Sequence, residues 1–218
     1  MNILFIGNSY TYFNDMPFLL QSLLSENGID ARVDAVTRGG RKLMEHLLPN
    51  DELGSRIDAL LALKKYDVLF LQEQSYFPIV GFEDFERSVI TLKNKVGACR
   101  TLLYSTWGRK AGCQLLADKG WTSEGMYDSL TEAYRRAAGT AGAEISPVGR
   151  VFAGIIKNSP ETELYNKDMS HPSYIGSCAA AVTHFKSITG RLPEKCATLG
   201  LAQDVLDILL TAAGSVKE

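Results

Sequence analysis

The chain opens with an unbroken apolar run that ends at a glycine. Residues 3–6 are all large and apolar, and Gly7, Asn8 and Ser9 follow them directly. A run without polar alternation is typical of a parallel strand covered on both faces. The turn after it leaves the sheet at its carboxyl edge, where open α/β sheets bind ligands. The pattern predicts a buried first strand that presents Ser9 as a nucleophile. The alternative is turn chemistry, in which Ser9 only caps the following helix.

Further along, apolar runs alternate with segments whose apolar residues recur every three or four positions. The runs predict strands at residues 31–37, 67–71, 100–105 and 144–146. The three-to-four spacing predicts helices at residues 16–26, 51–65, 82–96, 126–141, 148–157, 173–189 and 201–212. Residues 109–125 show neither pattern and are expected to form an excursion near the site. Such alternation indicates an α/β protein with a mainly parallel sheet wrapped by helices.

Length and composition favour a single domain over residues 1–218. The chain is 45% hydrophobic and 22% charged, which suits one well-filled core. Its formal net charge is -2 and no basic run occurs, so nucleic acid and anionic membrane are not expected partners. No apolar stretch approaches the roughly 20 residues that span a bilayer, and no secretion signal is evident. We therefore expect a cytoplasmic protein, or an exported one whose signal peptide was removed.

The four cysteines are Cys99, Cys113, Cys178 and Cys196. They form no Cys-x-x-Cys pair and have no histidine at metal-ligand spacing. We expect free thiols and no metal site.

Asp168 lies three residues before His171, close to the carboxyl end. In a compact turn this spacing brings the carboxylate to one imidazole nitrogen and leaves the other free to accept a serine proton. The alternative is that both residues cap the helix after Pro172. Of the other histidines, His46 is interpreted as a solvated helix residue and His184 as structural.

Four blocks in the same order resemble the SGNH (GDSL-like) hydrolase family across nearly the whole chain. They are Gly7-Asn8-Ser9, Gly39-Gly40, Leu71-Gln72-Glu73-Gln74 and Asp168-Met169-Ser170-His171-Pro172. The resemblance implies a three-layer α/β/α, flavodoxin-like fold whose five-stranded parallel sheet has the order 2-1-3-4-5. In that order the loops of the second and third blocks lie on either side of the first.

The resemblance also implies the roles of the site residues. Ser9 would be the nucleophile, His171 the base and Asp168 the group that steadies the imidazolium. The oxyanion hole would consist of the backbone N–H groups of Ser9 and Gly40 and the side-chain amide of Gln74. Activity would then rise with pH as His171 loses its proton.

Two blocks depart from the family pattern. The first usually has aspartate before the serine, and the near-isosteric Asn8 should leave the nucleophile untouched. The third is usually Gly-x-Asn-Asp, whereas this chain has Gln72-Glu73-Gln74-Ser75. Gln74 is one methylene longer than asparagine, so the strand end must retreat, and Gln72 is the other candidate donor. The combination resembles a bacterial branch of the family whose function is uncharacterised.

The function implied is removal of a small acyl group, foremost acetyl, from a carbohydrate or similar small ester. No cofactor or metal is implied, and no Gly-x-Ser-x-Gly, Gly-x-Gly-x-x-Gly or P-loop motif occurs. Tyr10, Gln72 and Trp107 are the expected substrate contacts. A lysophospholipase or acyl-thioesterase would use the same triad with an apolar channel built from residues 109–125. A third reading is a noncatalytic ligand-binding domain. The sequence leaves the oligomeric state open.

Overall fold

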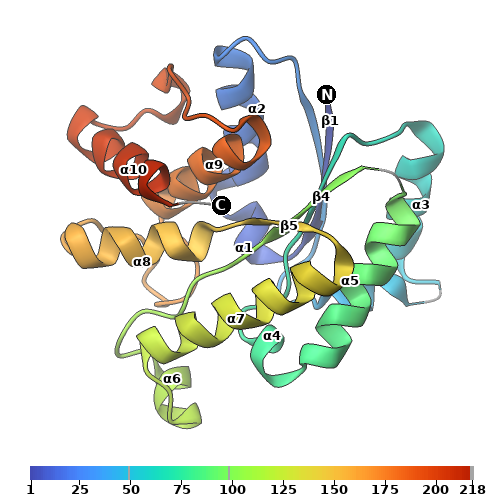
Figure 1. The fold of residues 1–218 in the computed structure, drawn as a ribbon, viewed down its shortest axis with the longest axis horizontal. Coiled ribbons are helices and arrows are strands. Elements are labelled where there is room, and N and C mark those ends of the chain that lie inside the picture. The colour runs from blue at the N-terminus through green and yellow to red at the C-terminus, as the bar shows by residue number, and fades with distance from the viewer. Residues whose placement is uncertain (49, 98, 217–218) are drawn as a thin grey trace.

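The computed structural model describes residues 1–48, 50–97 and 99–216, so residues 49, 98, 217 and 218 of the predicted domain lie outside the described part. One parallel sheet has the strand order β2-β1-β3-β4-β5, which confirms the predicted topology (Figure 1). Its strands are β1 (Asn2–Gly7), β2 (Arg32–Thr37), β3 (Val68–Leu71), β4 (Arg100–Tyr104) and β5 (Glu144–Ser146).

Strand β1 lies between β2 and β3, with Ile6 beside Val36 on one side and Leu71 on the other. Successive side chains of a strand point to opposite faces, so Phe5 joins the hydrophobic cluster on one face and Ile6 the cluster on the other. Both faces are covered, which explains the unbroken apolar run. Because β1 is central, Ser9 leaves the sheet between the loops that follow β2 and β3.

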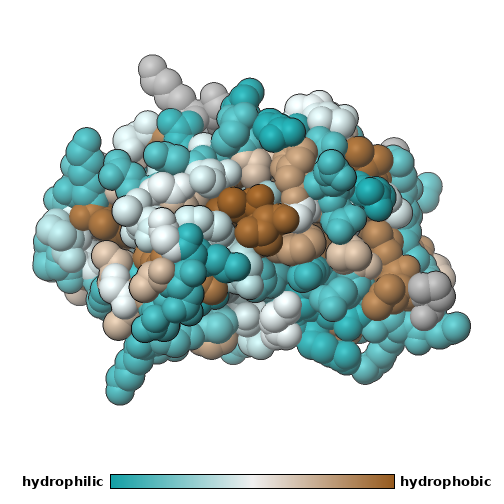
Figure 2. Space-filling view, turned by 90° about the horizontal axis from the view of Figure 1, so that it is seen from below, coloured by the Kyte–Doolittle hydropathy of each residue, from teal (hydrophilic) through white to brown (hydrophobic). Residues whose placement is uncertain are grey.

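Helices cover both faces of the sheet and complete the predicted three layers (Figure 1). One face packs against α2 (Met16–Glu26), α8 (Val148–Asn158), α9 (Tyr174–Thr189) and α10 (Gln203–Ser215). The other packs against α3 (Glu52–Leu63), α5 (Phe82–Val96) and α7 (Ser123–Ala141). In the view from below, hydrophobic surface forms separate patches among hydrophilic residues (Figure 2). None of the described helices is long and apolar enough to cross a membrane.

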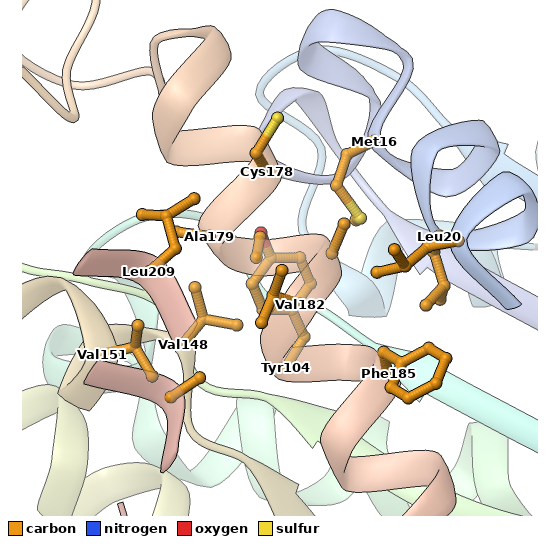
Figure 3. Packing of buried hydrophobic residues seen from close by; sticks show 14 of the residues in the cluster. Met16, Leu20, Tyr104, Val148, Val151, Cys178, Ala179, Val182, Phe185 and Leu209 are labelled. Atoms are coloured by element: carbon orange, nitrogen blue, oxygen red, sulfur yellow. The ribbon is translucent and has the colours of Figure 1, made fainter. Parts of the chain in front are cut away.

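Helix α9 is the most deeply buried of the helices on its face. Its small residues Ala179 and Ala181 let it approach the sheet closely, while Val182 and Phe185 fill the space beside Tyr104 of β4 (Figure 3). This packing matters for the site because the segment that carries His171 leads directly into α9.

Several short elements fall between the long ones. They are α1 (Ser9–Tyr12), η1 (Phe13–Asp15), η2 (Leu43–Leu47), α4 (Phe77–Val80), α6 (Gln114–Lys119) and η3 (Ala197–Leu199). Helix α7 begins at Ser123, three residues before the predicted start, because the Thr122 hydroxyl caps it by accepting from the N–H of Gly125. All four cysteines are free thiols, as predicted.

Candidate active site

Ser9 is the first residue of α1, immediately after β1 and Asn8. The Asn8 Oδ1 accepts the backbone N–H of Tyr10 at 3.1 Å, so Asn8 is the cap of this short helix. The alternative in which Ser9 is the cap is therefore wrong. As the first helical residue, Ser9 has a backbone N–H without an acceptor inside the helix.

The Asn8 amide also connects Ser9 to the loop after β2. Its Nδ2 donates to the carbonyl oxygen of Arg41 at 2.8 Å, and its backbone N–H donates to Oε1 of Gln72 at 2.9 Å. An aspartate here would have no hydrogen to give to the Arg41 carbonyl. Asparagine is thus more than an isosteric replacement, because its Nδ2 links the end of β1 to the loop after β2.

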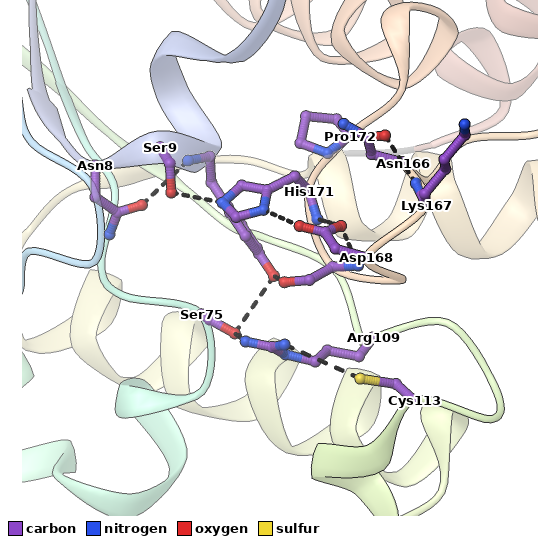
Figure 4. Close-up of polar contacts among 12 residues, drawn as sticks. Asn8, Ser9, Ser75, Arg109, Cys113, Asn166, Lys167, Asp168, His171 and Pro172 are labelled. Carbon is purple, nitrogen blue, oxygen red and sulfur yellow. Dashed lines mark hydrogen bonds and ion pairs between the residues drawn. The ribbon is translucent and has the colours of Figure 1, made fainter.

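His171 lies between Ser9 and Asp168 (Figure 4). Its Nε2 is 2.7 Å from the Ser9 Oγ, and its Nδ1 faces Oδ2 of Asp168. Oδ1 of Asp168 accepts the backbone N–H groups of Ser170 at 3.1 Å and His171 at 3.0 Å. Burial alone would raise the pKa of Asp168, but these bonds together lower it below its ordinary value, so the carboxylate stays charged.

The loop around His171 is fixed by contacts with α1 and η1. The Phe13 ring stacks on the imidazole with 4.2 Å between centroids and 13° between planes. Asn14 donates from Nδ2 to the Pro172 carbonyl at 3.2 Å, and the N–H of Asn166 donates to the His171 carbonyl at 2.7 Å. These contacts hold the imidazole in place beside Ser9.

The two loops predicted to complete an oxyanion hole follow the neighbouring strands β2 and β3. Gly40 is exposed and has a φ of 69°, a left-handed conformation that favours glycine. The Asn8–Arg41 hydrogen bond holds this loop beside Ser9. Gln74 is partly buried, and no hydrogen-bond partner of its side-chain amide is found among the described residues. That amide remains available to a ligand.

Glu73 joins these two loops, a role that the sequence analysis missed. Its side chain is fully buried, and its Oε1 accepts the N–H of Gln74 at 2.5 Å and that of Leu43 at 3.2 Å. Burial raises the pKa of Glu73 to about 8, although these N–H groups oppose the shift. A neutral carboxyl oxygen still accepts both bonds. A glutamate flanked by polar residues at a strand end was the only signal in the sequence.

The residues predicted to contact substrate are buried rather than exposed at the site. Gln72 is fully buried: its Oε1 accepts from Asn8 and from the Thr11 hydroxyl at 2.9 Å, and its Nε2 donates to the Glu73 carbonyl. It therefore supports the turn that carries Ser9 rather than presenting an amide to the substrate, and it is not the alternative donor.

Tyr10 and Trp107 are likewise interior residues, with exposed fractions of 3% and 1%. Their rings stack at 4.8 Å, and Tyr10 meets the His171 ring edge-on at 5.4 Å. The Tyr10 hydroxyl is 2.7 Å from the Ser170 Oγ, and Trp107 Nε1 donates to the Ser170 carbonyl. Both residues pack against the loop that carries His171. The prediction that they stack directly on substrate is wrong because both side chains are buried.

The other two histidines are both buried. The prediction of a solvated His46 is wrong, because its side chain is fully buried and Nε2 donates to the Gly7 carbonyl at 3.1 Å. His184 is structural as predicted, with Nδ1 at 2.7 Å from the Ser146 hydroxyl. Within the described ranges, no three metal-binding side chains cluster closely enough to hold an ion.

The doubly wound sheet and the Ser9–His171–Asp168 arrangement at its carboxyl edge define the class as a serine hydrolase. A solved structure from Slackia heliotrinireducens, assigned to the SGNH hydrolases, is 35% identical over 86% of this chain and 98% of its own, with a TM-score of 0.77. The chain belongs to the SGNH hydrolase family.

Two more distant structures share the fold. A DUF4886 family protein from Bacteroides uniformis has a TM-score of 0.81 at 21% identity, over 98% of this chain and 93% of its own. An acetyl xylan esterase has a TM-score of 0.65 at 18% identity, over 86% of this chain and 100% of its own. No family model and no curated protein matches the sequence.

Proposed function

We propose that the protein hydrolyses small acyl esters, acetyl esters of carbohydrates foremost, with Ser9 as nucleophile. The observation that carries the proposal is the 2.7 Å contact between Ser9 Oγ and His171 Nε2, with Asp168 on the opposite imidazole nitrogen. Likeness to an acetyl xylan esterase agrees with this substrate class.

The proposed reaction has two halves. His171 takes the Ser9 proton as Oγ attacks the ester carbonyl carbon, and the oxyanion is held by the N–H groups of Ser9 and Gly40 and the amide of Gln74. Collapse breaks the bond to the alcohol, which receives its proton from His171. Water then attacks the acyl-enzyme and gives a proton to His171, and His171 returns that proton to Ser9 Oγ as the bond to the acyl group breaks and the acid leaves. Asp168 stabilises the imidazolium in both halves.

We prefer a short acyl group to a long one because the cavity to which residues 109–125 contribute does not include Ser9 in its lining. A cavity of about 820 Å³ is lined by Trp107, Tyr165, Phe152 and others, but its lining includes neither Ser9 nor His171. The stacked rings of Trp107 and Tyr10 lie between this cavity and the imidazole. Residues 109–125 contribute to that cavity rather than to a channel at the serine. This cavity is therefore not an acyl channel of the lysophospholipase kind that leads from Ser9.

Labelling with a fluorophosphonate tests the proposal. Wild type, Ser9→Ala and the exposed-serine control Ser129→Ala are labelled and assayed with 4-nitrophenyl acetate and octanoate, with folding checked by circular dichroism. We expect labelling and acetate turnover in wild type and control, none in Ser9→Ala, and a preference for acetate over octanoate. Folded wild type that neither labels nor turns over ester would overturn the hydrolase mechanism in favour of a ligand-binding domain.

A further inference from the structure

Arg109 carries a positive charge beside the active site that no carboxylate of the described residues neutralises. It follows β4 at the carboxyl edge of the sheet, and its guanidinium is partly buried. Nε and Nη2 donate to the Ser75 hydroxyl at 3.3 and 3.2 Å, and Nη1 faces the Cys113 sulfur at 4.0 Å (Figure 4). Neither partner is a carboxylate.

Other arginines near the site contrast with Arg109. Arg41 pairs with Asp51 and Arg38 pairs with Glu52, so the charges of the loop after β2 are balanced locally. A partly buried guanidinium without an anion loses hydration that neutral acceptors replace only in part. Such a group is well suited to receive an anion from solution.

Arg109 is linked to the Ser9–His171 pair through Ser75 and Tyr10. Ser75 directly follows Gln74, and its hydroxyl accepts from the Tyr10 hydroxyl at 3.4 Å. Burial raises the pKa of Tyr10, while the nearby charges of Arg109 and Asp168 act on it in opposite directions. The Tyr10 phenol therefore lies between the charge of Asp168, beside His171, and the charge of Arg109.

We propose that Arg109 binds a carboxylate carried by the substrate, so that the preferred substrates are small acyl esters with a second, anionic group. This rests on the proposed esterase function and specifies its substrate class. Ser75 takes Nε and one hydrogen of Nη2, so the remaining hydrogens of Nη1 and Nη2 are the donors for a carboxylate. Hydrogen bonds to charged groups are the stronger kind. The carboxylate can belong to the acyl part, as in a dicarboxylic half-ester, or to the alcohol part, as in an acetylated acidic sugar.

Two matched ester pairs separate these sources. On the acyl side, 4-nitrophenyl hydrogen glutarate is compared with 4-nitrophenyl pentanoate. On the alcohol side, 4-acetoxybenzoate is compared with its methyl ester. Each pair gives a ratio of kcat/KM, anionic over neutral, after subtraction of uncatalysed hydrolysis. The ratio is measured for wild type, Arg109→Gln, Arg109→Lys and Arg191→Gln, which removes the same charge at a distant ion pair with Glu194.

We expect the ratio in one pair to fall about tenfold or more in Arg109→Gln, to be partly kept in Arg109→Lys and to be unchanged in Arg191→Gln. If Arg109 only supports the loop through Ser75, its loss lowers both members of a pair equally and the ratio stays constant. A constant ratio in both pairs overturns the proposal. Turnover of the neutral esters and fluorophosphonate labelling of wild type test the esterase function separately, so the two failures are distinguishable.

Discussion

Asn8 precedes the proposed nucleophile, and both ends of its side-chain amide have partners. Asn8→Asp keeps the cap on Tyr10 but turns the donor that faces the Arg41 carbonyl into an acceptor. The two oxygens would repel each other and the Gly40 loop would move away from Ser9. We expect kcat/KM for 4-nitrophenyl acetate to fall about tenfold, the effect of one lost hydrogen bond with an unpaired acceptor.

The control for this change is Asn94→Asp, which alters charge equally on the exposed side of α5. Its rate should equal that of wild type. Equal rates in Asn8→Asp and wild type would show that the Arg41 contact does not position the loop.

Gln74 is the proposed side-chain donor to the oxyanion, and its reach can be tested by length. Loss of one such donor costs about 10² to 10³ in rate, so Gln74→Ala should lose that much in kcat with folding intact. Gln74→Asn should recover little, because the backbone at Gln74 is tied to Glu73 and is set for the longer side chain. Full activity in Gln74→Ala would remove Gln74 from the oxyanion hole.

At this scale the sequence identified the three residues that the structure brings together, Ser9, Asp168 and His171. It did so because each lies in a short block with few structural alternatives. It misplaced Gln72 and His46 because burial depends on neighbours that are distant in sequence. A polar residue at a strand end can face the ligand or the core, and local pattern does not distinguish the two.

Among the elements, the loops after β2 and β3 are linked through the Glu73 carboxyl group. Glu73→Leu removes the acceptor of both N–H groups, from Leu43 and Gln74. We expect kcat to fall by about 10- to 100-fold with little change in KM. The proposed oxyanion donors on both loops would stabilise the transition state more than the bound ester. Glu73→Gln should restore most of the rate, since its amide oxygen accepts both bonds. Equal loss in the two variants would contradict a positioning role and indicate a requirement for the carboxyl group itself.

Most of the strands and long helices were predictable from the pattern, and the short helices were not. Helices α2 and α5 and strand β5 match their predicted bounds, and the other long elements differ by one to three residues at an end. Helix α1 has only 4 residues, too few to show a period, and the polar first turn of α7 hides its start. Residues 109–125 had no pattern because α6 is short and separated by turns.

Across the whole molecule, the sheet order and the juxtaposition of Ser9 with His171 could not follow from periodicity. The two residues are 162 positions apart, and local pattern carries no information on pairing between distant segments. The resemblance to a family supplied the strand order. Because β1 lies between β2 and β3 in that order, Ser9 lies between the loops that follow those two strands. Any strand order that moved β1 to an edge would separate Ser9 from one of the two flanking loops.

The burial of His46 makes the stability of the folded protein depend on pH. Burial lowers the pKa of His46 from 6.5 to about 4, despite the hydrogen bond to the Gly7 carbonyl. Between about pH 6.5 and pH 4 the unfolded chain therefore binds a proton at His46 that the folded protein does not bind. The contribution of neutral His46 to the free energy of unfolding is complete above pH 6.5 and is lost as pH falls toward 4. Glu73, whose pKa is raised to about 8, acts in the opposite direction, so the wild-type curve alone does not isolate the histidine.

His46→Gln isolates the histidine, because a glutamine amide can donate to the same Gly7 carbonyl but does not titrate. Free energies of unfolding are measured in urea for both proteins at about pH 7.5 and about pH 5. We expect the variant to gain up to about 2 kcal/mol relative to wild type on acidification, from 1.36 kcal/mol per pKa unit. A difference that does not change with pH would mean that His46 is protonated equally in the folded and unfolded states. His46 donates to the carbonyl of Gly7, two residues before Ser9, so this titration would act on the turn that carries Ser9.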